Sequence, residues 1–112
     1  MARKTEAPLN IAGLSGSQLE EYAARSGGRI QAQISSFENG LQIFRNISIV
    51  RIKSDRVNLL ILEDYMPILG EIDGDVDLIG RTEFYSLKGV KGFFCHEHNV
   101  FFLLLKESAD VG

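Results

Sequence analysis

Four consecutive residues near the C-terminus, Cys95-His96-Glu97-His98, have side chains that can bind metals or act as nucleophiles. Alternate residues of a strand point to one face, so His96 and His98 would lie together there, and imidazole is a common zinc ligand. A zinc site takes three or four protein ligands, and the chain has no third histidine. His96 and His98 are thus the only metal candidates, and the pattern favours a polar hairpin tip after a buried Cys95.

Nucleophilic catalysis by Cys95 would require a base beside its thiol. His96 is adjacent in sequence but faces away from Cys95 on a strand, which favours an inert thiol. A phosphate-binding loop is also missing, because Gly70, Gly74 and Gly80 are widely spaced and no Gly-Lys-Ser/Thr follows them. No nucleophile, base and orienting group could therefore meet, and the sequence predicts neither an enzyme nor a cofactor.

Two groups of carboxylates could in principle supply general acids or calcium ligands. Glu63 and Asp64 are adjacent, and the second group lies within residues 71–77. The second group lacks the spacing of an EF-hand loop and its closing bidentate glutamate. Asp75 and Asp77 alternate with apolar residues, which is typical of a strand that is wetted on one face. A structural role is therefore predicted for these carboxylates.

The elements that must position these residues begin with a flexible arm over residues 1–28, which carries one short helix at residues 17–26. Ser17 and Glu20, three residues apart, form a capping box, and Gly27-Gly28 is a left-handed stop. Leu19, Tyr22 and Ala23 fall on one face of this helix. Because so short a helix is marginal in water, we expect that face to pack on another part of the protein.

Residues 29–107 alternate between apolar and polar positions, as half-buried strands do. They predict one mostly-β domain, an antiparallel β-sandwich or barrel of about seven to nine short strands. Residues 108–112 are predicted to be a disordered tail. Turns or breaks are expected at Asn39-Gly40, at Pro67, at Asp73-Gly74, between separate strands over residues 84–87 and 92–95, and at the tip Glu97-His98-Asn99.

The length and charge of the chain limit its partners. A chain of 112 residues forms one domain, and a net charge of −3 disfavours nucleic acid, whose binding depends on clustered basic residues. The alternative is a small β-barrel that binds nucleic acid or assembles into rings. It would use Arg45, Arg51 and Lys53, together with phenylalanines that could stack on bases. These three basic residues and Arg56 form the one local basic patch that the sequence suggests.

The cellular location is predicted from the single cysteine and from the polar N-terminus. Cys95 cannot form an internal disulfide, and the first residues lead into no apolar core of the kind that a signal peptide requires. The longest apolar run, residues 100–105, has the length of a strand rather than of a membrane span. We expect a cytoplasmic protein with no membrane span, and association with a membrane complex stays open.

Two pairs of phenylalanines, at residues 93–94 and 101–102, make both faces of their strands apolar. A thin, small domain must leave one of these faces exposed, and exposed apolar patches usually mark protein interfaces. A second apolar stretch follows the expected break at Pro67. The sequence therefore predicts that the protein binds other protein subunits or a second copy of itself. The predicted partner-binding residues are Tyr65, Met66, Pro67, Ile68 and Leu69.

The stretch from Ile61 to Leu69, followed by Gly74 and Val76, resembles the sequence Ile-Leu-Pro-Gly-His-Ala-Pro-Leu-Leu in the epsilon subunit of rotary ATP synthases. The similarity covers about residues 30–106 and includes the later segments Glu83–Gly89, Gly92-Phe93 and Asn99-Val100. The family's Pro-Gly-His is replaced here by Glu63-Asp64-Tyr65, and its helical hairpin after the sandwich has no counterpart in these residues.

This resemblance implies the N-terminal β-sandwich domain of that subunit, which sits at the foot of the central stalk. In the family, this domain touches the gamma subunit and the ring of c subunits, and it carries no catalytic residues. The loop that matches residues 63–69 would face the ring. The resemblance thus implies a non-catalytic assembly module that couples the stalk and the ring.

Overall fold

The computed structural model describes residues 16–55 and 58–106, and all structural statements below concern these residues. The arm predicted before residue 16, the tail predicted over residues 108–112 and the side chains of Glu20 and Arg56 lie outside the described part. One helix and six strands are described: α2 (Gly16–Arg25), β2 (Ile30–Ser36), β3 (Gly40–Ser54), β4 (Asn58–Leu62), β5 (Ile68–Gly80), β6 (Phe84–Glu97) and β7 (Val100–Leu105).

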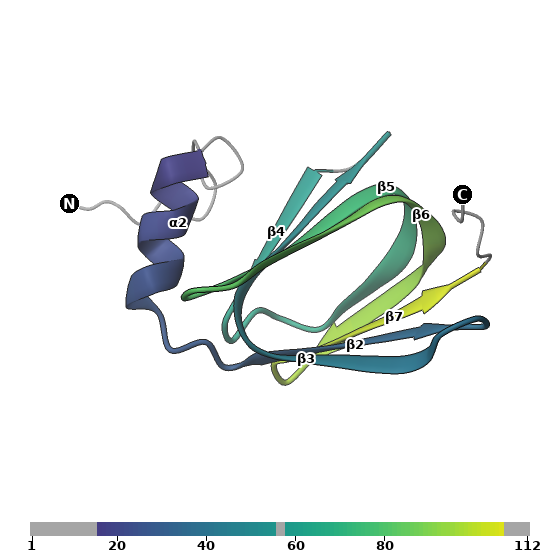
Figure 1. Ribbon diagram of the computed structural model, residues 1–112, viewed down its shortest axis with the longest axis horizontal. Helices are drawn as coiled ribbons and strands as arrows, with labels where there is room; N and C mark the ends of the chain where they lie inside the picture. The colour runs from purple at the N-terminus through teal and green to yellow at the C-terminus, as the bar shows by residue number, and fades with distance from the viewer. Residues whose placement is uncertain (1–15, 56–57, 107–112) are drawn as a thin grey trace.

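Five of the strands close into a barrel (Figure 1). Their order is β2-β7-β6-β5-β3, and β3 pairs with β2 again to complete the ring. One edge of the long strand β3 pairs with two strands, since its first half pairs with β2 and its second half pairs with β4. All pairs are antiparallel except β2–β7, which is parallel. The mostly-β prediction is confirmed, and the barrel fits the structure.

Two of the predicted breaks are wrong, because the chain passes through them as strand. Asp73-Gly74 is not a turn but part of β5, which has a bulge between Gly74 and Val76. Residues 84–87 and 92–95 are not separate strands, since both belong to β6. Glycine at position 74 allows a close strand crossing, because a Cβ there would collide with the carbonyl oxygen of Lys53.

The barrel interior is filled by one cluster of apolar side chains. Its buried members are spaced by even numbers of residues along β2, β5, β6 and β7, as the pleat requires, whereas β3 is irregular near Ile47. They include Ile30 and Ile34 of β2, Val50 and Ile52 of β3, Ile72 and Val76 of β5, Phe94 of β6, and Phe101 and Leu103 of β7. The ring of Phe101 stacks on that of Phe94, with 5.8 Å between the centroids.

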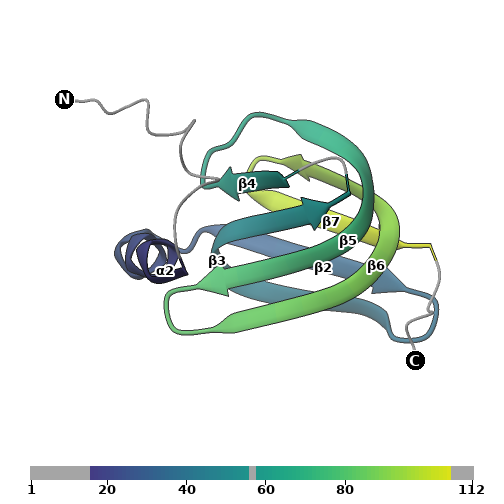
Figure 2. The same cartoon turned by 90° about the horizontal axis from the view of Figure 1, so that it is seen from above.

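A second, smaller cluster holds α2 against the outside of the barrel (Figure 2). Leu19 and Ala23 are buried against Ile49, Leu60 and Ile79, and Tyr22 packs beside them. The predicted packing face of the helix is confirmed. Ser48 donates a hydrogen bond to the carbonyl of Ala23 (3.4 Å), one of the carbonyls that a helix end leaves free. The left-handed stop is also confirmed, because Gly28 has φ of 62°.

Candidate docking surface

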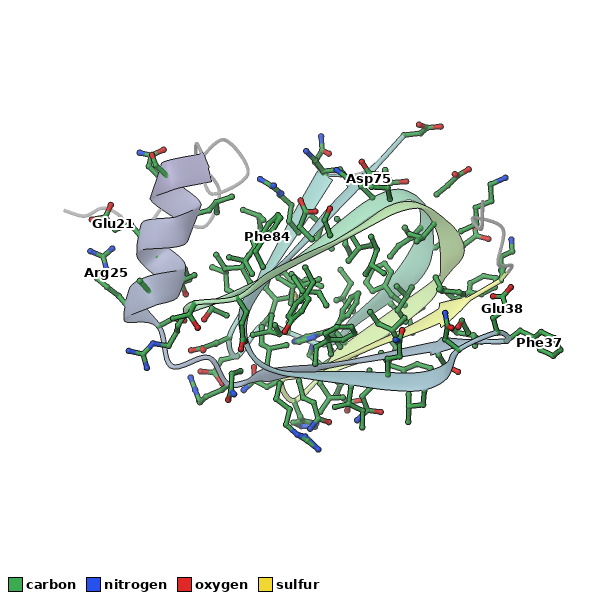
Figure 3. The ribbon with its side chains drawn as sticks, in the orientation of Figure 1. Glu21, Arg25, Phe37, Glu38, Asp75 and Phe84 are labelled. Atoms are coloured by element: carbon green, nitrogen blue, oxygen red, sulfur yellow. The ribbon has the colours of Figure 1, made fainter. Side chains whose placement is uncertain are left out.

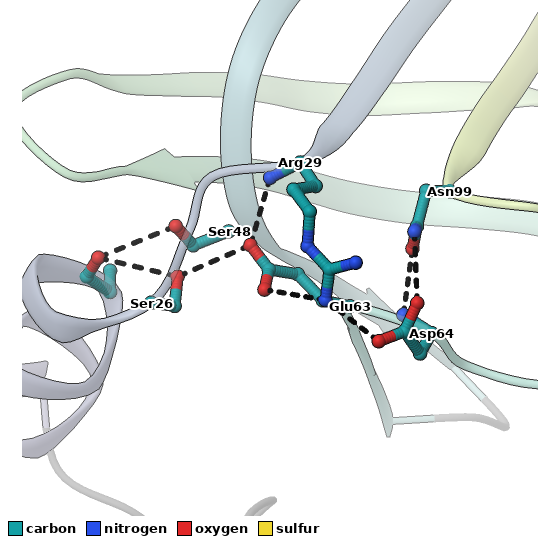
Figure 4. A network of polar contacts seen from close by, with 7 residues as sticks. Ser26, Arg29, Ser48, Glu63, Asp64 and Asn99 are labelled. Atoms are coloured by element: carbon teal, nitrogen blue, oxygen red, sulfur yellow. Dashed lines mark hydrogen bonds and ion pairs between the residues drawn. The ribbon is translucent and has the colours of Figure 1, made fainter.

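The segment from Glu63 to Pro67 connects β4 to β5, and a network of polar contacts fixes its first residues (Figure 4). Oε2 of Glu63 accepts a hydrogen bond from the backbone N–H of Arg29 (2.8 Å) and one from the hydroxyl of Ser26 (3.4 Å). The Arg29 guanidinium reaches Oδ2 of Asp64 at 2.7 Å. The segment is therefore tied to the linker that leads from α2 into β2.

Asp64 also ties the segment to the tip of the β6–β7 hairpin. Its backbone N–H donates to Oδ1 of Asn99 (2.7 Å), and Nδ2 of Asn99 donates to Oδ1 of Asp64 (3.1 Å). Asp64, His98 and Asn99 all have positive φ, which Asp and Asn tolerate better than most residues. The predicted hairpin tip is confirmed. Hydrogen bonds from Arg29 and then from Asn99 lower the pKa of Asp64, so this exposed carboxylate stays charged.

The five predicted partner-binding residues divide between the core and the surface. Tyr65 and Ile68 are half-buried and pack against the interior cluster. Met66, Pro67 and Leu69 are exposed, with Met66 at 65% and Leu69 at 77% of their full accessible surface. We refer to residues 65–69 as the docking segment. Two of its side chains thus anchor in the barrel, and the other three face outward.

Leu69 continues into an apolar face on the outside of the barrel. Residues that pair across a sheet point to the same side, so the strand registers give the rows of this face. Leu69 pairs with Cys95, and Cys95 pairs with Phe102. In the next row, Phe93 pairs with Leu104. All five side chains are exposed, and we call them the outer apolar face.

The same rows reach β3 through two polar residues of β2. Phe102 pairs with Gln33, which pairs with Ile43, and Leu104 pairs with Ser35, which pairs with Leu41. Leu41 and Ile43 are exposed, and Phe37 at the tip of the β2–β3 hairpin is 98% exposed (Figure 3). Sequence analysis missed Leu41, Ile43 and Phe37. The rows that contain Leu41 and Ile43 also contain residues 93 and 102, which belong to the phenylalanine pairs that the sequence analysis singled out.

The structure separates His96 from His98. The two side chains face the opposite way from the prediction: Cys95 is exposed, and His96 is fully buried inside the barrel. His98 lies in the turn beyond β6 and is 86% exposed at its side chain. Within the described ranges, no group of three or more His, Cys, Asp or Glu side chains is placed to hold a metal ion.

The acidic and basic residues on the other outer side of the barrel pair with each other. Asp77 is nearly fully buried, and its Oδ2 accepts hydrogen bonds from Nε (3.0 Å) and Nη2 (2.8 Å) of Arg51. The hydroxyl of Ser86 donates to Oδ1 at 2.8 Å. Arg51 is therefore held by a buried carboxylate, and among the described members of the predicted patch Arg45 and Lys53 are exposed.

Within the described residues, no helix has the length and apolar character that crossing a membrane requires.

The closed barrel, the external helix and the apolar outer face together define the class of protein, which is a small β-domain that presents a non-polar surface. The described residues contain no cluster of metal-binding side chains. Neither a protein-family model nor a curated protein sequence matches the chain. A solved structure does match it. This is one chain of the central stalk and c-ring in the cryo-EM structure of the mitochondrial ATP synthase of Tetrahymena thermophila.

That chain superimposes with a TM-score of 0.54 and shares 12% of its residues with this protein. The match covers 75% of this chain and 78% of the other. At this identity the similarity concerns the fold alone. It supports the resemblance to a component of a rotary ATP synthase at the level of the fold, without singling out the epsilon subunit.

Proposed function

We propose that this protein is a non-catalytic assembly module that binds another protein subunit through the docking segment and the outer apolar face. The observation that supports this function most directly is the continuity of the two surfaces. Leu69 belongs to both, and its exposed side chain adjoins Cys95 and Phe102 across the strands. Burying such non-polar area against a partner is favourable by roughly 25 cal/mol per Å².

The partner that fits this surface is a protein with a non-polar face of its own. Polar groups border the surface, as they do in many protein interfaces. Lys106 lies over the ring of Phe93, with 5.2 Å from Nζ to the ring centroid, and reaches Glu71 at 3.8 Å. By its resemblance to the epsilon subunit, the partner we propose is a stalk or ring subunit of a rotary ATP synthase, and the role is to couple the two parts.

The test is reconstitution with purified central stalk and c-ring of a rotary ATP synthase at about pH 7.5, where His96 is neutral because burial lowers its pKa. We expect the wild-type protein to comigrate with the complex. The double variant Met66→Asp/Leu69→Asp should lose binding by at least about tenfold, because two charges would be buried without partners. Both residues are exposed, so circular dichroism should show that the double variant stays folded.

Phe84→Asp is the matched control, because Phe84 is another exposed apolar residue (Figure 3) that lies on β6 but pairs with Ile79, away from the docking segment. This variant should bind like the wild type. Equal binding of the double variant would refute the docking surface. If the wild type binds neither the stalk nor the ring, the coupling role is wrong, and sedimentation would then show whether a second copy is the partner.

A further inference from the structure

His96 is a titratable group that the docking function does not use, and its surroundings are unusual. Its side chain is 0% exposed, and neither ring nitrogen has a hydrogen-bond partner in the protein. A neutral imidazole has one donor and one acceptor, and a protonated one has two donors. Protonation inside the barrel would therefore add a charge and a second unpaired donor.

The groups that face His96 are apolar. Ile68 of β5 and Phe101 of β7 pair with it across the sheet, and the Phe101 ring lies 6.4 Å from its ring, centroid to centroid. The interior cluster is apolar, Tyr65 packs against it, and no charged group of the described residues contributes to the pKa shift of His96. The other buried polar residues, Ser48 and Asp77, are hydrogen-bonded elsewhere. No carboxylate among these groups could stabilise an imidazolium.

His96 also lies directly beneath the docking segment. Its cross-strand neighbour Ile68 is the first residue of β5, and Ile68 and Tyr65 are the two side chains that anchor the segment in the barrel. The hairpin tip that follows His96 also holds Asp64, the residue just before the segment, through two hydrogen bonds with Asn99. Exposing the His96 ring to water would therefore separate the strand pairs that fix the segment.

We propose that His96 makes the docking surface sensitive to pH, because its protonation opens the start of β5 and releases the docking segment. The consequence for binding rests on the proposed function, whereas the opening itself does not.

The direction of the effect follows from burial. Burial lowers the pKa of His96 from its ordinary value of 6.5. In an opened segment the imidazole regains its ordinary pKa, so the opened form binds the proton more readily. The closed form is therefore fully stable above pH 6.5 and loses stability as the pH falls from 6.5 through the lowered pKa. A partner that binds the closed form would lower this pKa further.

The chain contains no tryptophan, so Met66→Trp places a single tryptophan, which can be excited selectively over tyrosine, on the docking segment. We would follow its emission and the His96 ring signals in NMR spectra from about pH 7.5 to about pH 5. We expect an emission change with the same midpoint as the His96 titration, at constant strand content by circular dichroism. Adding His96→Leu should abolish the change, and adding His98→Gln should preserve it.

Three results would overturn the switch: titration of His96 without an emission change, an emission change that persists in the His96→Leu background, or loss of all strand structure at the same midpoint. His96→Phe serves if His96→Leu fails to fold. Because the reconstitution described above is done near pH 7.5, where His96 is neutral in either case, failure of the switch and failure of the docking function are separate results.

Discussion

At the scale of single residues, Asp77 is held charged by its hydrogen bonds. Burial works to raise the pKa of Asp77, but the hydrogen bonds from Arg51 and Ser86 outweigh it and leave the pKa below its ordinary value of 3.8. Replacing this carboxylate would leave the Arg51 guanidinium, which is about three-quarters buried, without its charged partner. Removing one partner of a buried pair is costlier than removing an exposed pair.

Asp77→Asn is therefore expected to lower the free energy of unfolding by about 1–3 kcal/mol, measured by urea denaturation at neutral pH. Asp75→Asn is the matched control, because Asp75 (Figure 3) is more exposed and its partner Lys88 is mostly exposed, so a loss below about 1 kcal/mol is expected. In the wild type, the contribution of Asp77 is present above pH 3.8 and lost as the pH falls through its lowered pKa. Equal losses in both variants at neutral pH would contradict this assignment.

The sequence did not reveal whether Cys95 or His96 is the buried residue of this pair. Cys95 and His96 are adjacent, so the period-two pattern puts one inside and one outside, and propensity alone favours a buried cysteine. The apolar residues on both sides of His96, at positions 94 and 101–104, fit either register. The pairing of β6 with β5 and β7 decides it, because Phe94 and Phe101 fill the barrel and bring His96 in with them.

At the scale of elements, Leu19 is the most deeply buried large side chain by which α2 packs on the barrel. Leu19 is nearly fully buried between the helix and the barrel, while Glu21 and Arg25 form an exposed pair at 3.8 Å on the solvent side (Figure 3). Leu19→Ala should lower the free energy of unfolding by about 2–4 kcal/mol and reduce the helical signal in circular dichroism. Glu21→Ala, the control on the opposite face, should cost no more than about 0.5 kcal/mol. If Leu19→Ala left both signals unchanged, the packing of α2 on the barrel would be refuted.

The helix, its packing face and its glycine stop could be predicted because they depend on neighbours in sequence. The continuity of β5 and of β6 through the predicted breaks could not. Asp73-Gly74 has the composition of a turn, but Gly74 is required where β5 passes close to β3. Gly89 has φ of 62°, yet it lies inside β6. A glycine that permits a turn also permits a bulge, and only the partner strand distinguishes them.

At the scale of the whole molecule, the outer apolar face is assembled by the pairing of separate strands. Its rows combine residues from β5, β6 and β7, and extend through β2 to β3. Sequence analysis could indicate that strands with two apolar faces need a partner, but it could not join Leu69 to Phe102, which are far apart in sequence. Registers between strands supply that connection, so the extent of the surface had to come from the structure.

Cys95 offers a direct test of this surface, because it is exposed between Leu69 and Phe102 and is the chain's sole cysteine. Maleimide should react with Cys95 readily in the free protein, and a bound partner should slow the reaction at least about tenfold, since a covered thiol cannot be attacked. A protein labelled beforehand should fail to bind the partner while keeping its circular dichroism spectrum, because the adduct would project outward from the barrel. Cys95→Ser/Phe84→Cys carries its thiol outside the proposed interface and is the matched control. Its labelling should leave binding intact, and undiminished binding of the protein labelled at Cys95 would place the partner on another face of the barrel.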